Sequence, residues 1–260
     1  MADAVRDRWA AGEVALNAWC TFGGASAAAI LAGTGFDAVT VDLQHGERSP
    51  EGLGEVVGAI EGGGAVPFAR VGWNDPASVM RALDLGARGV ICPMVDTAED
   101  AERFVSFCRY PPVGARSYGP VRSAFGTGRG QTAAANETVL AFAQIETAEG
   151  LANVEAICAT AGLDGVYVGP ADLSLALGFE GFADLGAPDM LTALDRVVAA
   201  ADAGGVVPGV HAPSVDRAVE MARRGFRFIG AAGDAELLRE GAAEAVERTR
   251  ADRRAEADPT

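Results

Sequence analysis

One pattern dominates the sequence: a short run rich in Val, Ile, Phe and Ala recurs about every 20 to 35 residues, separated by segments with helical spacing of apolar positions. Several runs, such as GVICPM and GVYVGP, are almost continuously apolar, as in parallel strands covered on both faces. Eight such β/α units fit a chain of 260 residues, since a closed barrel of this kind has roughly 250. The pattern therefore predicts an α/β fold, a single (β/α)8 TIM barrel. An open doubly wound sheet is the alternative.

The expected elements alternate along the whole chain. We expect strands over Ala15–Phe22, Ala38–Gln44, Val66–Val71, Gly89–Met94, Val139–Glu146, Gly165–Gly169, Val206–His211 and Phe226–Ala231. We expect helices that include Asp75–Leu85, Ala98–Phe107, Ala148–Ala159, Ala187–Ala203, Ser214–Arg224 and Ala235–Arg248. Pro76, Ser214 and Asp234 stand where helix starts favour proline or a capping side chain.

No composition change divides the chain, so we expect one domain over residues 1–260 with a charged, frayed tail over 249–260. The segment from Tyr110 to Asn136 is rich in Gly and Pro and lacks periodicity. Long loops inside compact domains are usually functional. We therefore expect this one to lie over the barrel mouth or at a subunit contact.

Charge excludes several classes of partner. The formal net charge of −15 repels phosphate backbones and anionic membranes, so neither nucleic acid nor a membrane is an expected partner. The first residues carry charges where a signal peptide needs an apolar region, and a cytoplasmic location is expected. The four cysteines lack metal-ligand spacing and read as buried, reduced thiols.

Ionisable residues close four of the expected strands. Asp42 and His45 follow the second strand, Arg70 ends the third, Glu146 ends the fifth, and Asp172 follows the sixth. In a barrel the carboxyl ends of the strands carry the chemistry, so these side chains converge on one rim. Neighbouring strands lie about 4.8 Å apart. The two carboxylates Glu146 and Asp172 can therefore reach one hard divalent cation.

Each of these residues also has a structural interpretation. Glu146 is a candidate helix cap, although Thr147 can take that place, and Asp172 is a candidate N-cap of the next helix. Arg70 can pair with an acid such as Asp42, and His45 can be a hydrogen-bonded loop histidine. The coincidence of four strand ends favours the functional interpretation.

The chain contains no lysine, so all 21 of its basic Lys and Arg residues are arginines. Enzymes that act on carbonyl substrates through a Schiff base need a lysine amine. The sequence excludes that route and favours metal-assisted chemistry.

The sequence resembles the HpcH/HpaI aldolases, metal-dependent (class II) enzymes that cleave or form 4-hydroxy-2-oxo acids. The resemblance covers roughly residues 14–238. The segments that carry it are FDAVTVDLQHGERSP, PFARVGWNDPASVMRALDLGARGVICPMVDTAEDAE, RYPPVGARSYGP, AFAQIETAEGLANVEAI and LDGVYVGPADLSLALG. It implies a barrel whose C-terminal helix is exchanged between subunits of a homo-oligomer, a trimer or hexamer.

The resemblance also implies roles for individual residues. Glu146 and Asp172 would bind a divalent ion, Mg, Mn or Co. Arg70 would contact the keto oxygen of the bound 2-oxo acid. His45 would take part in proton transfer with Asp84 behind it, and whether His45 or a metal-bound water is the base stays open.

Other residues would complete the pocket. Gln144 and Ala171 would line the substrate site. Asp42 would lie next to the residues that bind the metal ion without contacting the ion itself. Trp19 is either an apolar wall of the pocket or a core residue. Gln44 departs from the resemblance, since many members carry Glu at this position.

The expected reaction is reversible cleavage of a 4-hydroxy-2-oxo acid to pyruvate, or hydroxypyruvate, and an aldehyde through a stabilised enolate. Two alternatives remain. One is a citrate-lyase-type enzyme acting on acyl-CoA, which the acidic chain disfavours. The other is a catalytically silent barrel that binds a 2-oxo acid, which Gln44 favours.

Overall fold

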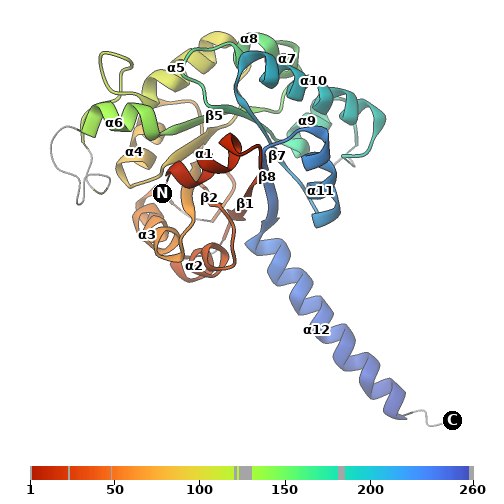
Figure 1. The fold of residues 1–260 in the computed structure, drawn as a ribbon. Coiled ribbons are helices and arrows are strands. Elements are labelled where there is room, and N and C mark those ends of the chain that lie inside the picture. Colours follow the sequence, from red (N-terminus) through yellow and green to blue (C-terminus); the bar gives the residue numbers. More distant parts are fainter. Residues whose placement is uncertain are drawn as a thin grey trace.

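The computed structural model describes residues 2–22, 24–47, 49–119, 122, 131–180 and 185–257. Eight parallel strands close into a barrel in chain order. Figure 1 shows the strands as a ring surrounded by helices. The strands are β1 (Ala15–Cys20), β2 (Ala38–Asp42), β3 (Val66–Arg70), β4 (Gly89–Cys92), β5 (Leu140–Ile145), β6 (Gly165–Val168), β7 (Val207–His211) and β8 (Phe228–Gly233).

Pairing of the first strand with the last decides between a barrel and an open sheet. Ala15 in β1 lies opposite Phe228 in β8, and both strands also pair with their other neighbours. The prediction of a closed (β/α)8 barrel is therefore confirmed, and the open sheet is excluded. All eight expected strands are present, with small differences at their ends.

Helices cover the outside of the ring, and their bounds are as follows. They are α1 (Ala2–Ala10), α2 (Ala25–Gly33), η1 (Pro50–Gly52), α3 (Leu53–Gly63), α4 (Pro76–Asp84), α5 (Ala98–Cys108), α6 (Gln131–Thr138), α7 (Ala148–Ala152), α8 (Val154–Cys158), α9 (Pro170–Ala176), α10 (Pro188–Gly204), α11 (Val215–Arg224) and α12 (Asp234–Ala257).

Alternation along the strands divides the core into two layers. Side chains that point outward pack against the helices, and those that point inward fill the ring. Three inward phenylalanines, Phe68, Phe142 and Phe228, lie within 6.0 Å of one another between ring centroids. These side chains fill the interior of the barrel toward the amino ends of the strands. A ligand can therefore bind only near the carboxyl ends.

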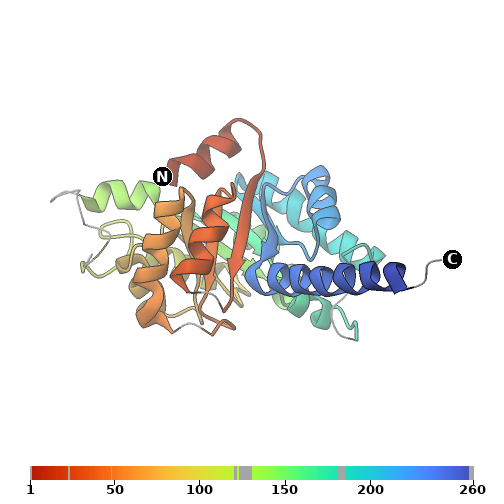
Figure 2. The ribbon, with the colours of Figure 1, turned by 90° about the horizontal axis from the view of Figure 1, so that it is seen from below.

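Helix α1 covers the amino end of the ring. Val5 is fully buried, and Trp9 packs on Phe142 and Phe228 while its indole N–H donates to the Arg227 carbonyl over 2.9 Å. Figure 2 shows α1 at one end of the barrel and α12 leaving from the other. The open end is therefore the one where β8 passes into α12.

Two helix starts agree with their sequence signals. Asp75 accepts from the Ser78 backbone N–H at the start of α4, and Ser214 accepts from that of Arg217 before α11. Asp234, which was expected to cap a helix, is the first residue of α12. Its Oδ1 accepts from the Thr21 backbone N–H over 2.9 Å and from that of Ala235, so it joins α12 to the end of β1.

Two expected helices have different extents. The helix predicted over Ala148–Ala159 is divided at Asn153, which turns between α7 and α8 and donates its side-chain amide to the Asp96 carbonyl. Helix α12 continues through residues 249–257, where we expected a frayed tail. That stretch consists mainly of Ala, Arg and Glu, which are strong helix formers, and residues 258–260 lie outside the described part.

The segment Tyr110–Asn136 does not lie over the barrel mouth in the part that the structure describes. It connects the end of α5 to the start of β5, and such a connection lies at the amino ends of the strands. Asn136 exchanges hydrogen bonds with the backbone of Tyr110, and Figure 2 shows α6 at the same end as α1. The expectation of a subunit contact stays a prediction, and residues 120–121 and 123–130 lie outside the described residues.

The four cysteines are free and buried, as predicted. Burial raises the pKa of the Cys108 and Cys158 thiols to about 12, so neither is a thiolate near neutral pH. Within the described ranges, no helix combines the length and apolar character needed to cross a membrane.

Candidate active site

A cavity of about 230 Å³ opens at the carboxyl ends of the strands. Residues from seven of the eight strands, or from the segments that follow them, line it, so it is built as barrel active sites are. Its lining residues are Trp19, Thr21, Asp42, His45, Arg70, Gln144, Glu146, Tyr167, Gly169, Pro170, Ala171, Asp172, His211 and Glu236.

Arg70 and Asp42 form an ion pair on one wall. Their strands place them opposite each other, because Asp42 in β2 is in register with Arg70 in β3. Arg70 Nε lies 3.0 Å from Asp42 Oδ1, and Nη2 lies 2.5 Å from Oδ2. Burial raises the pKa of Asp42, but the hydrogen bonds and charge of Arg70 outweigh it, so the pKa lies below its usual value.

The pair leaves part of Arg70 available. Asp42 also accepts from the backbone N–H groups of Gln44 and His45, so this carboxylate is anchored to the loop as well as to Arg70. Among the described residues, Nη1 of Arg70 has no hydrogen-bond acceptor. The structural interpretation of Arg70 as an ion-pair partner is therefore correct, and the same side chain also faces the cavity.

Trp19 is both a core residue and a wall of the cavity. The Arg70 guanidinium carbon lies 4.7 Å from the centroid of its ring, and its indole N–H donates to the Tyr167 hydroxyl over 3.1 Å. His211 meets the same ring edge-on at a centroid distance of 5.6 Å. Trp19 thus packs on one face of the Arg70 guanidinium and stabilises its position.

Glu146 follows β5 and points into the cavity. Its Oε1 accepts from the Met94 backbone N–H over 2.9 Å, and its Oε2 accepts from the Gln144 amide. Thr147, and not Glu146, caps α7 by accepting from the Gly150 N–H. Burial, and then the negative charge of Asp172, raise the pKa of Glu146. The helix-cap interpretation of Glu146 is therefore excluded.

Asp172 lies in the first turn of α9, directly after β6, the strand that pairs with β5. The N-cap of that helix is Gly169, which makes no side-chain cap bond, and Asp172 is exposed toward the cavity. A Cβ on Gly169 would collide with the Glu146 carboxylate and the Gln144 amide. The absence of a side chain at Gly169 therefore leaves space beside the Glu146 carboxylate, where a ligand could bind.

This donor set fits a hard divalent cation. The negative charge of Asp172 contributes to the raised pKa of Glu146, and a positive ion beside Glu146 would stabilise its charged form. Mg²⁺ uses one or two carboxylates together with waters and substrate oxygens. The described residues contain no group of three or more His, Cys, Asp or Glu side chains arranged for a metal. An ion held here would therefore keep several positions for water or substrate.

His45 and Asp84 do not meet within one chain. His45 is exposed at the cavity, whereas the Asp84 carboxylate accepts from Arg116 over 2.8 Å and does not line the cavity. The cause is topological: a helix that follows a barrel strand runs back, so α4 brings its last residue to the amino end. A role for Asp84 stays a prediction that this chain alone does not support.

Several lining residues carried no clear sequence signal. Tyr167 lies within an apolar strand, and Glu236 belongs to the first turn of α12, where an acid is ordinary. His211 ends β7, which is the signal that could have identified it. Burial, followed by the positive charge of Arg70, lowers the pKa of His211 to about 4, although Glu236 opposes the shift. Gln144 and Ala171 line the cavity as expected, but Gln44 does not.

Comparisons with known proteins agree with this geometry. The family model described as "HpcH/HpaI aldolase/citrate lyase" matches residues 18–241. A hydroxypyruvate/pyruvate aldolase of Rhizorhabdus wittichii is 40% identical over 250 residues, which cover 95% of this chain and 98% of the relative. A 4-hydroxy-2-oxo-heptane-1,7-dioate aldolase of Salmonella dublin is 31% identical, covering 93% of this chain and 92% of the relative.

Solved structures give the same relationship. A crystal structure of an HpcH/HpaI aldolase/citrate lyase family protein from Burkholderia cenocepacia superposes with a TM-score of 0.87 at 33% identity. The superposition covers 96% of this chain and 98% of that one. With the family match extending over most of the barrel, the chain belongs to the HpcH/HpaI aldolase/citrate lyase family.

Proposed function

We propose that this protein is an aldolase that reversibly cleaves or forms a 4-hydroxy-2-oxo acid, with pyruvate or hydroxypyruvate and an aldehyde as the other side of the reaction. The observation that carries the proposal is one cavity in which a fixed arginine, with a free donor, faces two adjacent carboxylates. The names of the relatives support the same reaction class.

Enzymes of this family generally depend on a divalent metal ion. We propose that Glu146 and Asp172 hold that ion, with Mg, Mn and Co as the candidates. When bound, such an ion supplies Lewis-acid stabilisation of the negative charge that develops on a 2-oxo acid. Gln144 and Met94 hold Glu146 through hydrogen bonds, so the carboxylate is oriented before any ligand arrives.

The chain's own residues act on charge and protons. Arg70 donates from Nη1 to the substrate oxygen that becomes an enolate, while Asp42 keeps the guanidinium in place. In cleavage, a base removes the proton of the 4-hydroxyl, the C3–C4 bond breaks and the aldehyde leaves. The enolate then takes a proton at C3 and becomes the 2-oxo acid. His45 is exposed at the cavity, where it can move these protons directly or through water.

An acyl-CoA substrate fits this cavity poorly. The phosphates of CoA require cationic partners, and among the described residues that line the cavity Arg70 is the single arginine, already paired with Asp42. Four lining carboxylates add repulsion. The structure therefore favours a small 2-oxo acid as substrate.

Exchange of the C3 protons of pyruvate with solvent tests the proposal without requiring the right aldehyde. We expect the protein with Mg²⁺ or Mn²⁺ to exchange these protons in D₂O, measured by loss of the methyl signal in proton NMR, because enolate formation is half of the reaction. A silent binder would show affinity for pyruvate without exchange. A requirement for CoA would support the thioester-lyase alternative. Either result would reject the aldolase.

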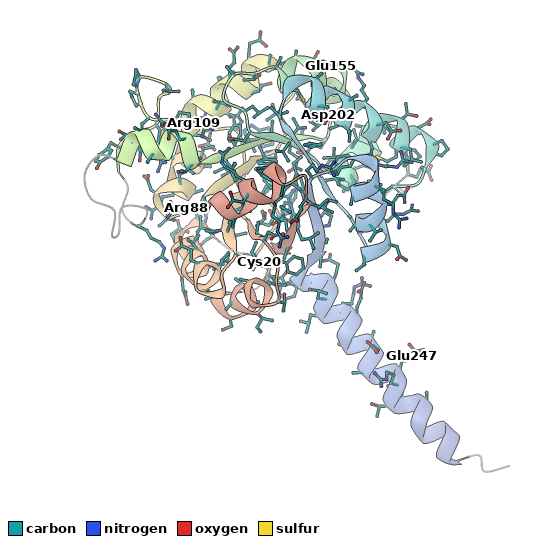
Figure 3. The ribbon with its side chains drawn as sticks, in the orientation of Figure 1. Cys20, Arg88, Arg109, Glu155, Asp202 and Glu247 are labelled. Atoms are coloured by element: carbon teal, nitrogen blue, oxygen red, sulfur yellow. The ribbon has the colours of Figure 1, made fainter. Side chains whose placement is uncertain are left out.

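We also propose that α12 packs on a neighbouring subunit of a homo-oligomer. The helix extends away from the barrel, as Figures 1 and 2 show, and side chains along it such as Glu247 lie far from the ring (Figure 3). It exposes Leu237, Leu238 and Val246 to solvent in the single chain. An apolar stripe on a projecting helix is costly unless another surface covers it.

The mass of the protein in solution tests this arrangement. Light scattering is expected to give the mass of a trimer or hexamer, since the chain alone has a mass of 26.5 kDa. Leu238→Glu is expected to shift the mass toward the single chain, because a charge would then be buried in the contact. Thr249→Glu, at an exposed position on the same helix but more distant from the barrel, adds the same single negative charge and is the control. A monomeric wild type would exclude the exchange.

A further inference from the structure

One carboxylate of the cavity is not used in the reaction described above. Glu236 lies in the first turn of α12, directly after β8, and lines the cavity beside His211 and Trp19. Its negative charge opposes the lowering of the His211 pKa. Glu236 therefore faces the cavity, although the rest of α12 projects outward.

Gly233 allows Glu236 to take this position. A Cβ built on Gly233, the last residue of β8, would collide with Oε2 of Glu236. The carboxylate thus folds back over the end of β8, toward Trp19, whose Cβ lies 3.7 Å from the same Cβ position. Because residue 233 is glycine, the Glu236 carboxylate can lie against the end of β8 at the barrel rim.

The position of Glu236 in the ring assigns it to the aldehyde side. Glu146 and Asp172 follow β5 and β6, and these hold the 2-oxo acid end in the proposed reaction. In the closed ring, β8 lies opposite β4 and three strands from β5, so Glu236 lies nearly across the cavity from Glu146. A substrate whose carboxylate lies beside Glu146 and whose chain crosses the cavity would bring its C4 end toward Glu236.

Charge on this side of the cavity is not compensated. Among the described lining residues, Arg70 is committed to Asp42, and Glu146 and Asp172 face the proposed ion. His211 is the remaining candidate for a positive charge next to Glu236. With a pKa of about 4 its ring is neutral near pH 7, and its Nδ1 is buried without a hydrogen-bond partner in the described part of the chain.

We propose that Glu236 is a specificity-determining residue, which makes the aldehyde subsite select uncharged aldehydes over aldehydes that carry a carboxylate. A carboxylate accepts hydrogen bonds and repels a second carboxylate, so it lowers the affinity for an anionic acceptor while tolerating a neutral one. The inference rests on the proposed aldolase function. It adds the class of aldehyde, which the family relationship leaves open.

A matched pair of aldehydes measures the charge effect. Succinic semialdehyde and its uncharged methyl ester, methyl 4-oxobutanoate, differ mainly in the carboxylate. With pyruvate and metal at fixed concentrations, we expect wild type to favour the ester by about tenfold in kcat/KM, and Glu236→Gln to bring that ratio close to one. Taking the ratio within each variant cancels any change in the pyruvate half of the reaction.

Two further variants make the result specific. Gly233→Ala keeps the charge of Glu236 but displaces its carboxylate, so the ratio is expected to move in the same direction. Glu102→Gln removes an exposed acid on α5, away from the cavity, and is expected to leave the wild-type ratio unchanged. Gly233→Ala also keeps the test decisive if Glu236→Gln does not fold.

The outcomes separate this inference from the proposed function. If wild type exchanges pyruvate protons but the ester preference is absent, or persists in both cavity variants, Glu236 does not select the aldehyde. If wild type neither exchanges pyruvate protons nor forms product with either aldehyde, the aldolase proposal and this inference both fail.

Discussion

Replacing Arg70 with alanine is expected to lower kcat/KM for pyruvate proton exchange by about a hundredfold to a thousandfold, the usual cost of removing one preorganised donor to a developing oxyanion. The structure supports an effect of this size because the guanidinium is fixed by two hydrogen bonds to Asp42 and by the Trp19 ring. A donor that is already oriented needs no reorganisation when charge develops. Rates are measured by NMR in D₂O with the metal at a saturating concentration and pyruvate varied from below to above its KM.

Arg70→Lys is the informative companion to that variant. Lysine keeps the positive charge but cannot bind Asp42 in the two-point geometry of a guanidinium, so we expect only partial recovery of the rate. Thermal unfolding of both variants controls for stability, because removal of Arg70 leaves Asp42 buried without its ion-pair partner. Normal exchange in a folded Arg70→Ala protein would exclude this arginine from enolate stabilisation.

Removal of the metal is expected to have an even larger effect. Treatment with a chelator should reduce exchange and aldol cleavage to the background rate, and Mg²⁺, Mn²⁺ or Co²⁺ should restore them. The reason is that the negative charge on the substrate has no cation beside it other than Arg70 among the described lining residues. The same logic predicts that Glu146→Gln and Asp172→Asn each weaken binding of Mn²⁺, followed by electron paramagnetic resonance.

The control for these two variants is Glu99→Gln, which removes an exposed acid at the start of α5. It is expected to bind Mn²⁺ as wild type does. Full activity after removal of the metal has been verified by elemental analysis would contradict the two-carboxylate site. Unchanged Mn²⁺ affinity in both Glu146→Gln and Asp172→Asn would place the ion elsewhere.

The strands were predictable because their signal is strong and local. Runs such as the one in β5 are buried at every position, and parallel strands covered on both faces require this. Helices α1 to α3 were not assigned individually. Helix α2, for example, consists mainly of Ala, Gly and Ile, so it lacks a clear polar face.

The core of the site was predictable for a topological reason. Carboxyl ends of barrel strands meet at one rim, so residues that end different strands, such as Arg70 and Glu146, were expected in one cavity and are found there. Glu236 lacked this advantage, since it follows the last strand by three residues and lies in an ordinary helical turn. Only the path of the chain at Gly233 shows that it faces inward.

Two expectations did not take into account the direction of a helix within one chain. Each barrel helix runs back to the amino end, so both Asp84 at the end of α4 and the segment after α5 lie away from the cavity. This rule needs no coordinates once the barrel is accepted. Residues at the ends of helices should therefore be assigned to the closed side of the barrel before any pairing with the site is inferred.

The most direct test of the account is a crystal structure of the protein with Mn²⁺ and pyruvate, with the ion located by its anomalous scattering. The account predicts one peak that both Glu146 and Asp172 contact, with pyruvate bound next to it and within hydrogen-bond distance of Arg70. A peak at another site, or pyruvate bound away from Arg70 with the two carboxylates apart, would contradict it.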